Sequence, residues 1–439
     1  MSNVSRRKFI SLAGATAAGT FLVHGCSSGN KAGSGTSPSA APAANVNPAD
    51  APEVTTAKLG FIALTDAAPL IIAKEKGFYE KYGMKDVEVI KQASWGTTRD
   101  NLVVGSAGGG IDGAHILTPM PYLISTGKVT DGKKVPMFIL ARLNLNGQGI
   151  QLSNDYKDLK IETDSSPLMD AFSKAKAAGK NEIKCAMTFP GGTHDMWIRY
   201  WLAAGGINPD KDVSTIVVPP PQMVANLKTG TMEAFCVGEP WPLQTVNQNL
   251  GYNALTTGEL WKDHPEKAFA MRADWVEKNP KATKALLMAV QEAQIWCDND
   301  ENKEEMCKIL SKREWFKVPY DDIIDRSLGK FNMGSRQFES KDLMQKYWRD
   351  NASYPYQSHD LWFLTENIRW GYFAPDTDTK KLVAAVNRED LWREAAKAIG
   401  QEAAIPKSPS RGVETFFDGV KFDPENPSAY LKSLKIKKV

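Results

Sequence analysis

The sequence predicts an α/β protein with two lobes, each containing a mostly parallel β-sheet flanked by helices. Apolar runs of strand length alternate with segments of helical length along most of the chain. This alternation is typical of βαβ units, in which a helix of roughly 10–15 residues connects two parallel strands. The chain beyond its first 54 residues is about 385 residues long, which is more than one hydrophobic core usually organises. We therefore expect two lobes.

The elements of the first lobe follow from apolar runs and from the glycines between them. We expect strands at 58–64, 87–90 and 135–143, and helices at 67–76 and 97–104. Gly77 ends the first helix, because glycine readily adopts the left-handed conformation that closes a helix. A glycine-rich run from Gly105 to Gly113 follows the second helix.

A second set of βαβ units predicts the second lobe. We expect its strands at 183–187, 215–218 and 232–237, and its helices at 193–204 and 223–228. Beyond about Lys262 the chain becomes helix-rich, and Pro280 begins a long amphipathic helix that extends to about Cys297. The segment from Arg388 onward contains few strand signals, and we expect it to wrap around the first lobe.

The first 26 residues have the pattern of an export signal with a lipid attachment site. An arginine pair, Arg6 and Arg7, precedes an apolar run at 10–23, and Cys26 follows a small residue. The run is shorter than the roughly 20 residues that span a bilayer, so a cleaved signal peptide at 1–25 is favoured over an anchor helix. The arginine pair resembles a twin-arginine signal, but general secretory signals also contain such pairs, and both routes stay open. We expect lipidation of Cys26.

The composition favours a tethered body without a nucleic-acid surface. Residues 26–54 contain the lipidated cysteine and a Gly/Ser/Ala/Pro-rich stretch, which is typical of a flexible tether. The chain has 54 basic and 51 acidic residues. Removal of residues 1–25 takes away three basic residues and no acid, which leaves the mature chain formally neutral. No basic stripe with interleaved aromatics is present, so nucleic-acid binding is not expected.

The cysteines and histidines give no support for a metal site. Four cysteines remain once Cys26 is assigned to lipid: Cys185, Cys236, Cys297 and Cys307. Disulfides are possible outside the cytoplasm, but the first two of these cysteines lie in apolar strand-like runs where a buried free thiol is common, so free thiols are favoured. The sequence contains no Cys-x-x-Cys and no His-x-x-His pair, so we expect no zinc site and no other metal or cofactor.

Several segments resemble a known family. Residues 68–84 are similar to the opening of the periplasmic binding proteins for sulfonates, taurine and nitrate. The segments that narrow the resemblance to the nitrate-binding lipoproteins of cyanobacterial ABC transporters, and to their bicarbonate-binding sisters, are 91–95, 105–113, 197–201, 264–269 and 411–419. The resemblance implies a type II periplasmic-binding-protein fold, with lobe I at 55–152 plus 263–439, lobe II at 153–262, and the ligand in the cleft between them.

The resemblance also assigns an anion pocket, residue by residue. The matching positions are Trp95, Gln148, His194, Gly238 and Lys267. Nitrate accepts hydrogen bonds and donates none, so a pocket made of donors suits it: an indole, an amide, an imidazole, a backbone N–H and an ammonium. Each residue on its own is more often structural, as a buried tryptophan or a solvated lysine usually is. The motifs shared with the family support the assignment of all five residues to the pocket.

Position 267 separates nitrate from bicarbonate. The bicarbonate-binding sisters carry an acid there, which can accept the hydrogen bond of the bicarbonate hydroxyl. A lysine cannot accept it, and an unpaired buried hydroxyl costs about 1–3 kcal/mol. We expect nitrite to be admitted as a second acceptor-only anion. Sulfate is disfavoured because its double charge and tetrahedral shape do not suit a flat site with one lysine.

These observations predict the substrate-binding component of an ABC transporter for nitrate and nitrite. It would be lipid-anchored on the periplasmic face of the inner membrane and would deliver its ligand to the permease and ATPase subunits. One alternative is a bicarbonate- or sulfonate-binding protein. A cytoplasmic nitrate sensor is a further alternative, although it would normally lack the export signal. Another is an enzyme like the relatives of this fold that make a thiamine precursor, for which Asp112, Asp195 and Glu239 are cleft candidates; we expect these acids to cap helices or to form lobe contacts.

Overall fold

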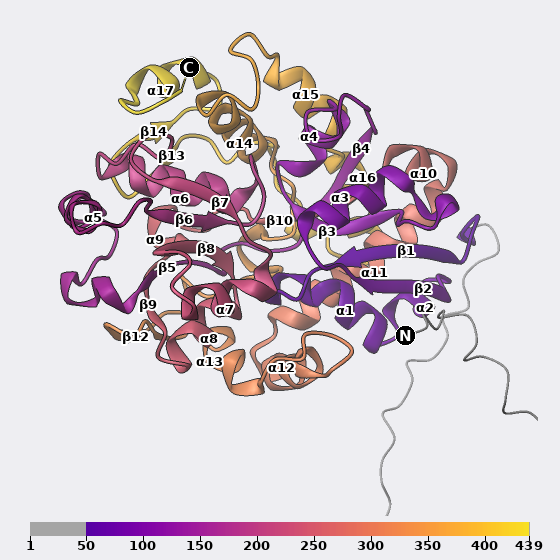
Figure 1. Ribbon diagram of the computed structural model, residues 1–439. Coiled ribbons are helices and arrows are strands. Elements are labelled where there is room, and N and C mark those ends of the chain that lie inside the picture. The colour runs from indigo at the N-terminus through magenta and orange to yellow at the C-terminus, as the bar shows by residue number, and fades with distance from the viewer. Residues whose placement is uncertain (1–49, 439) are drawn as a thin grey trace, which may run out of the picture. The chain divides into compact units, whose positions relative to one another are not determined.

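The computed structural model describes residues 50–438 (Figure 1). The predicted signal peptide, Cys26 and nearly all of the tether lie outside these residues, so the predictions about them stay predictions.

The first sheet has five strands in the order β2-β1-β3-β10-β4. Its strands are β1 (Thr56–Phe61), β2 (Asp86–Lys91), β3 (Gly113–Leu117), β4 (Met137–Arg142) and β10 (Lys267–Arg272). The first three pair in parallel, whereas β10 runs antiparallel to β3 and to β4. Every residue of β3 is buried, as expected for a central strand with helices over both faces of its sheet.

The second sheet repeats this arrangement in the order β7-β6-β8-β5-β9. Its strands are β5 (Gln148–Ser153), β6 (Lys184–Met187), β7 (Ser214–Val217), β8 (Ala234–Gly238) and β9 (Gly251–Thr256). Here β5 is the strand that runs antiparallel to its neighbours, β8 and β9. In Figure 1 the two sheets lie in different halves of the described structure. Two sheets flanked by helices confirm the predicted fold class.

Each antiparallel strand is the first one after the chain changes sheets. Strand β5 follows β4 after a short connection, and β10 brings the chain back to the first sheet after β9 and α9. The predicted boundary between the lobes, at 152/153, falls near the end of β5, whose pairing places all of it in the second sheet. The division into lobes itself stays a prediction.

Seventeen α-helices and two short strand pairs complete the described part of the chain. The helices in the first 260 residues are α1 (Ala68–Glu75), α2 (Phe78–Lys81), α3 (Trp95–Val104), α4 (Met120–Ser125), α5 (Pro167–Ala177), α6 (Thr193–Ala204), α7 (Met223–Lys228), α8 (Trp241–Asn247) and α9 (Thr257–Leu260). The later ones are α10 (Ala273–Lys278), α11 (Pro280–Asp298), α12 (Lys303–Ser311), α13 (Ile324–Ser327), α14 (Gln357–Arg369), α15 (Thr379–Val386), α16 (Glu389–Ala398) and α17 (Pro427–Ser433). The strand pairs are β11 (Lys330–Asn332) with β12 (Gln337–Glu339), and β13 (Glu414–Thr415) with β14 (Lys421–Phe422).

All the elements predicted from the sequence are present, most with small shifts at their ends. The helices α6 and α7 begin and end at the predicted residues. The sequence analysis missed the strands β3, β5, β9 and β10 of the two large sheets and both short strand pairs. The four cysteines of the described chain are free and buried, which confirms the preference for free thiols.

The expectation that the C-terminal segment wraps around the first lobe is only partly right. Helix α16 does pack against helix α11 and against β4, a strand of the first sheet. Further on, however, the segment turns to residues of the predicted second lobe: Trp261 Nε1 donates to Glu414 Oε2 at 2.9 Å, and Tyr200 donates to Asp418. The cause is aromatic packing, because the Phe416 ring lies 5.1 Å from that of Trp261.

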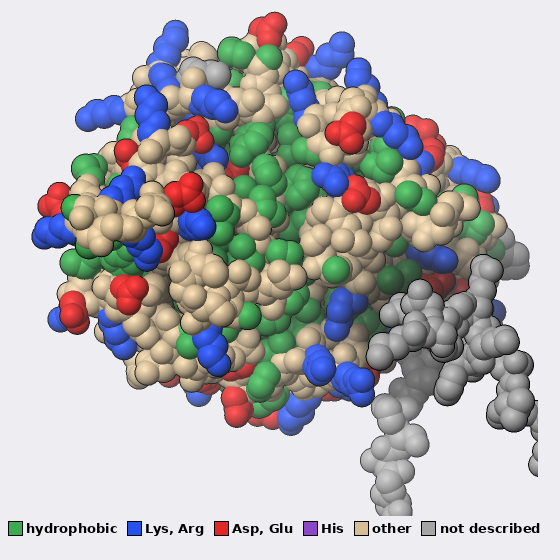
Figure 2. Space-filling model, in the orientation of Figure 1, with side chains coloured by type: hydrophobic (Ala, Val, Ile, Leu, Met, Phe, Trp, Pro, Cys, Tyr) green, Lys and Arg blue, Asp and Glu red, His purple; other side chains and the backbone are tan. Residues whose placement is uncertain are grey.

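The visible face of the molecule shows basic and acidic side chains interspersed, without a continuous basic stripe (Figure 2). This distribution agrees with the near-equal counts of the two classes. No helix within residues 50–438 is long and apolar enough to cross a membrane.

Candidate functional site

The two sheets place three of the predicted site residues at the edge where their parallel strands end. Gly238 is the last residue of β8 and pairs with Gln148, the first residue of β5. Lys267 is the first residue of β10 and pairs with Leu117, the last residue of β3. Because β5 and β10 run antiparallel, their starting residues lie at the carboxyl ends of their neighbours. This edge is where open α/β sheets bind ligands.

Two helices bring the other predicted residues to the site at their N-termini. Trp95 is the first residue of α3, which Ser94 caps by accepting a hydrogen bond from the Thr97 backbone N–H at 3.0 Å. His194 is the second residue of α6. The unpaired N–H groups and the dipole at such helix ends favour a negative charge.

The five predicted residues converge in a buried cluster. His194 Nε2 lies 2.8 Å from Gln148 Oε1, and Lys267 Nζ lies 3.5 Å from the same oxygen. The Lys267 ammonium is also 5.9 Å from the centroid of the Trp95 ring. A Cβ atom at Gly238 would lie 2.5 Å from Gln148 Oε1, so only glycine fits there without a shift. The four side chains are at most 1% exposed.

Trp95 has an unused hydrogen-bond donor. Its Nε1 is buried and has no partner among the described residues, although its ring lies against His115 with a centroid distance of 5.3 Å. Buried indole N–H groups are nearly always hydrogen-bonded in folded proteins. The Trp95 N–H is therefore available to an acceptor at this site.

The structure adds two carboxylates that the sequence analysis did not assign to the site. Lys267 Nζ lies 2.8 Å from Asp66 Oδ2 and 2.9 Å from Glu266 Oε1. Asp66 also accepts a hydrogen bond from Gln148 Nε2 at 3.1 Å, and its other oxygen lies 2.5 Å from His115 Nε2. The five predicted residues therefore lie beside two acceptor groups, and which of these groups contact a ligand stays a prediction. We call Asp66, His115, His194, Glu266 and Lys267 the Lys267 cluster.

The charges of the Lys267 cluster support one another. Burial disfavours the charge on Asp66, but the Lys267 charge and the hydrogen bond from His115 outweigh burial and hold the pKa of Asp66 well below its ordinary value. Burial likewise opposes the ammonium, yet Asp66 and Glu266 raise the pKa of Lys267 above its ordinary value. The lysine is therefore a fixed positive charge at the centre of the cluster.

Glu266 connects the cluster to helix α6. Its side chain accepts hydrogen bonds from the Thr193 hydroxyl, from Trp197 Nε1 at 2.7 Å and from Lys267 Nζ. Burial raises the pKa of Glu266, whereas these donors and the lysine charge oppose that rise. Since all three of these partners are donors, the surroundings suit a carboxylate rather than a carboxylic acid.

The histidines around the site are held neutral. Burial and the neighbouring Lys267 ammonium lower the pKa of His194 well below its ordinary value. Burial also lowers the pKa of His115, although Asp66 opposes the shift. Burial lowers the pKa of His264 to about 3. The cluster thus contains one fixed cation and no charged imidazole at neutral pH.

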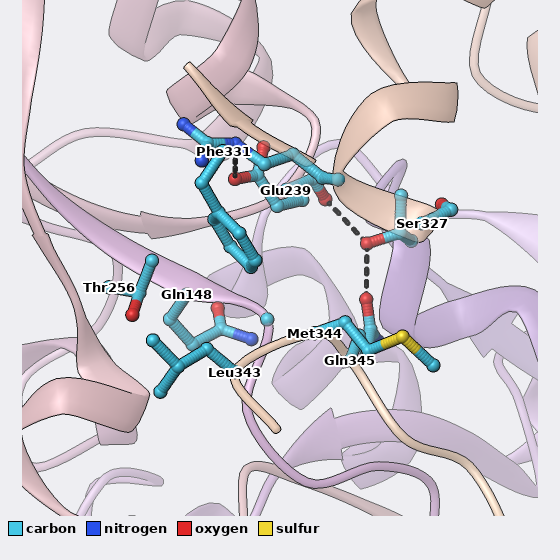
Figure 3. Close-up of a pocket in the computed structure, with 11 residues that line it drawn as sticks. Gln148, Glu239, Thr256, Ser327, Phe331, Leu343, Met344 and Gln345 are labelled. Carbon is cyan, nitrogen blue, oxygen red and sulfur yellow. Dashed lines mark hydrogen bonds and ion pairs between the residues drawn. The ribbon is translucent and has the colours of Figure 1, made fainter. Parts of the chain in front are cut away.

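A small pocket of about 10 Å³, which is room for about one water molecule, adjoins the cluster (Figure 3). It shares Gln148 with the site, and Glu239, Leu343 and Gln345 also line it. The Glu239 carboxylate lies 3.1 Å from Arg326 Nε, which is one of the interactions drawn in Figure 3.

The three acids considered for catalysis have structural partners. Asp112 accepts from the Lys58 backbone N–H at 2.9 Å. Asp195 pairs with Arg199 at 2.7 Å within helix α6. Glu239 accepts from the Leu243 backbone N–H at 3.2 Å. In the described part of the chain, no group of three or more His, Cys, Asp or Glu residues is arranged to hold a metal ion.

Comparison with known proteins places the whole chain among binding proteins. It is 71% identical to the nitrate/nitrite binding protein NrtA of Synechocystis sp. strain PCC 6803, over the full length of both chains. It is 46% identical to the bicarbonate-binding protein CmpA of Synechococcus elongatus, over 99% of this chain and 98% of that one. It is also 34% identical to the nitrate import ATP-binding protein NrtC of Synechocystis, over 86% of this chain and 55% of that one.

Solved structures and sequence families agree with this placement. The crystal structure of the periplasmic nitrate-binding protein NrtA from Synechocystis matches with a TM-score of 0.86 and 76% identity, over 88% of this chain and 100% of that one. A ligand-binding component of an ABC-type import system from Staphylococcus aureus shares the fold, with a TM-score of 0.59 at 14% identity, over 77% of this chain and 98% of that one. Residues 50–311 match the NMT1-like family. The chain therefore belongs to the NMT1-like family, in the same group as the nitrate/nitrite binding protein of Synechocystis.

Proposed function

We propose that this protein is the substrate-binding component of an ABC transporter, and that it captures nitrate and nitrite and delivers them to the permease. The observation that carries the proposal is the convergence of buried donors. His194 Nε2 and Lys267 Nζ both face one oxygen, Gln148 Oε1, beside the unpartnered Trp95 Nε1. The full-length similarity to a nitrate/nitrite binding protein supports the same function.

The anion would replace contacts that these residues make with each other. Gln148 Oε1 is a neutral acceptor within reach of His194 and Lys267, and we propose that an anion oxygen takes its place. Nitrate presents three acceptor oxygens, so it can take the donors of His194 and Lys267 and add that of Trp95. Hydrogen bonds from a charged donor to an anion contribute about 1.5–3 kcal/mol each, which suits the capture of a four-atom ligand.

The two carboxylates do not turn the site into one for bicarbonate. Asp66 already accepts from Lys267 and Gln148, and Glu266 accepts from three donors. Each carboxylate has about four acceptor sites, and most of them are already taken. The bicarbonate hydroxyl would have to compete with these donors, so the lysine keeps its discriminating role. Sulfonates are disfavoured because the cluster is fully buried and leaves no room for an organic group next to Lys267.

The protein acts as a binding protein and not as an enzyme, as its full-length relatives do. We further propose that it is held at the periplasmic face of the inner membrane by a lipid on Cys26, next to permease and ATPase subunits. The lipid attachment pattern around Cys26 and the periplasmic location named for the solved relative support this location. A tether would keep the binding site at high effective concentration near the permease.

Titration calorimetry with nitrate, nitrite, bicarbonate and sulfate tests the proposed ligand. We expect heat with nitrate and nitrite, and none with bicarbonate or sulfate. Lys267→Glu should abolish nitrate binding, because it replaces the central cation with a third carboxylate. Lys284→Glu makes the same change on an exposed face of α11 and should bind nitrate like the unaltered protein. Absence of heat with nitrate would overturn the proposal.

A further inference from the structure

The Lys267 cluster carries a net negative charge before any anion binds. Lys267 contributes one positive charge, and Asp66 and Glu266 contribute one negative charge each. His115 is neutral, because its Nδ1 accepts from the Ile62 backbone N–H at 3.5 Å while its Nε2 faces Asp66. These side chains are at most 1% exposed. Adding the negative charge of an anion to this buried cluster costs free energy unless a positive charge is added with it.

His194 is the group placed to supply that charge. It faces the donors of the site through Nε2, which lies 3.4 Å from Lys267 Nζ and 3.6 Å from Glu266 Oε1. The remaining ionisable groups near it come from η2 (Thr65–Ala67), β3, the segment before β10 and α6 itself: Asp66, His115, His264 and Asp195. The Asp66 charge favours a proton on His194, the two histidines are neutral, and Asp195 pairs with Arg199. In the absence of the anion, the lysine charge opposes a second cation. An anion between the two donors would remove that repulsion.

The hydroxyl group next to the second ring nitrogen of His194 can hydrogen-bond to both the neutral and the protonated ring. His194 Nδ1 lies 2.6 Å from the Thr188 hydroxyl. In the neutral ring the hydroxyl donates to Nδ1, and Nε2–H donates to Gln148. In the imidazolium, Nδ1–H donates to the hydroxyl oxygen instead, while Nε2–H stays a donor toward the anion. The proton can therefore be added by rotating one hydroxyl, without moving a heavy atom.

We propose that the site takes up one proton with each nitrate, and that His194 receives it at Nδ1. This inference rests on the proposed function, because it describes how the same site accepts its anion. The proton comes from solvent and returns to it when nitrate leaves, so the complex keeps the net charge of the free cluster. Nitrate capture therefore becomes stronger as the pH outside the cell falls.

Calorimetry of the purified protein with nitrate, in buffers of different ionisation enthalpy, measures the proton uptake. At pH 8 we expect the heat of binding to depend on the buffer with a slope of about one proton per nitrate. Between pH 6.5 and 8.5, Kd should rise by up to about tenfold per pH unit. Nitrate binding with buffer-independent heat and a constant Kd would overturn the inference and leave the proposed function intact. No nitrate binding at any pH would instead remove the proposed function.

Two variants test whether His194 is the residue that takes up the proton. His194→Gln keeps an amide donor in place of the ring but cannot be protonated, so it should bind nitrate more weakly, without buffer dependence and with a pH-independent Kd. His359→Gln removes another buried histidine, one outside the cluster, and should keep the proton uptake of the unaltered protein. Persistent uptake in His194→Gln would refute the assignment to His194. If that variant does not fold, the buffer series on the unaltered protein still decides whether a proton is taken up.

Discussion

At the scale of single residues, Lys267 is the centre of the candidate site. Its ammonium is fully buried and lies within 3 Å of two carboxylates, that of the preceding residue Glu266 and that of Asp66 from a distant part of the chain. The family resemblance identified five residues that do lie together, but it did not include these acids. Asp66 is separated from Lys267 by about 200 residues, and no local pattern around Asp66 shows that the fold brings it there.

Gly238 offers a residue-scale test of how closely the site is packed. Its Gly238→Ala variant would place a methyl group 2.5 Å from Gln148 Oε1 and 3.3 Å from Asp66 Oδ2, so the methyl group would fill part of the space that we propose for the anion. We expect nitrate binding to weaken at least tenfold, or about 1.4 kcal/mol, in a calorimetric titration. Gly96→Ala is the control, because its added methyl group makes ordinary contact with Ser94 at 3.6 Å. Equal nitrate affinity in both variants would contradict the packing described here.

At the scale of elements, the strands that carry the site were the hardest to predict. Helix α6 was predicted correctly because its apolar positions and its glycine stop follow the usual helical pattern. Strands β5 and β10, which begin at Gln148 and Lys267, were missed. Each has a polar residue at its start and is buried on both faces, so neither shows the alternation that marks a strand. Pairing with neighbouring strands, rather than the local sequence, makes these two segments form strands.

The C-terminal segment provides an element-scale test. Phe416 is 4% exposed and packs against Trp261, Tyr200 and Trp362, which belong to three different parts of the fold. Phe416→Ala should lower the free energy of unfolding by about 3 kcal/mol, because it leaves a cavity among these rings. Urea denaturation measures the change. Val413→Ala, at a position that is 57% exposed, should change the stability by less than about 0.5 kcal/mol. A Phe416→Ala variant as stable as this control would show that the segment contributes little.

At the scale of the whole molecule, buried neutral histidines should make stability depend on pH. Burial lowers the pKa of the four histidines in the described chain, His115, His194, His264 and His359. Below pH 6.5, which is the ordinary pKa of histidine, the unfolded chain binds protons that the native state does not bind. Stability is therefore lost as the pH falls below 6.5, by about 1.4 kcal/mol per pH unit for each neutral histidine.

The acids modify this profile in both directions. The pKa of Asp66 is lowered, so its contribution is present above its ordinary value and is lost as the pH falls further. Burial raises the pKa of Glu239 to about 6, so its contribution is present below 4.5 and disappears as the pH rises through 6. Burial also raises the pKa of Glu266 and of Asp360, which act in the same direction as Glu239, but the four histidines outnumber these acids. We expect the urea midpoint without nitrate to be lower at pH 5 than at pH 7; an unchanged or higher midpoint would contradict the neutral histidines.

A crystal structure of the protein grown with saturating nitrate tests the central claim most directly. We predict planar density within hydrogen-bonding distance of Trp95 Nε1, His194 Nε2 and Lys267 Nζ, with Gln148 displaced from its contact with His194. Lys267 should still contact Asp66 and Glu266. Nitrate bound elsewhere, or an unaltered cluster with no added density at saturation, would contradict the account.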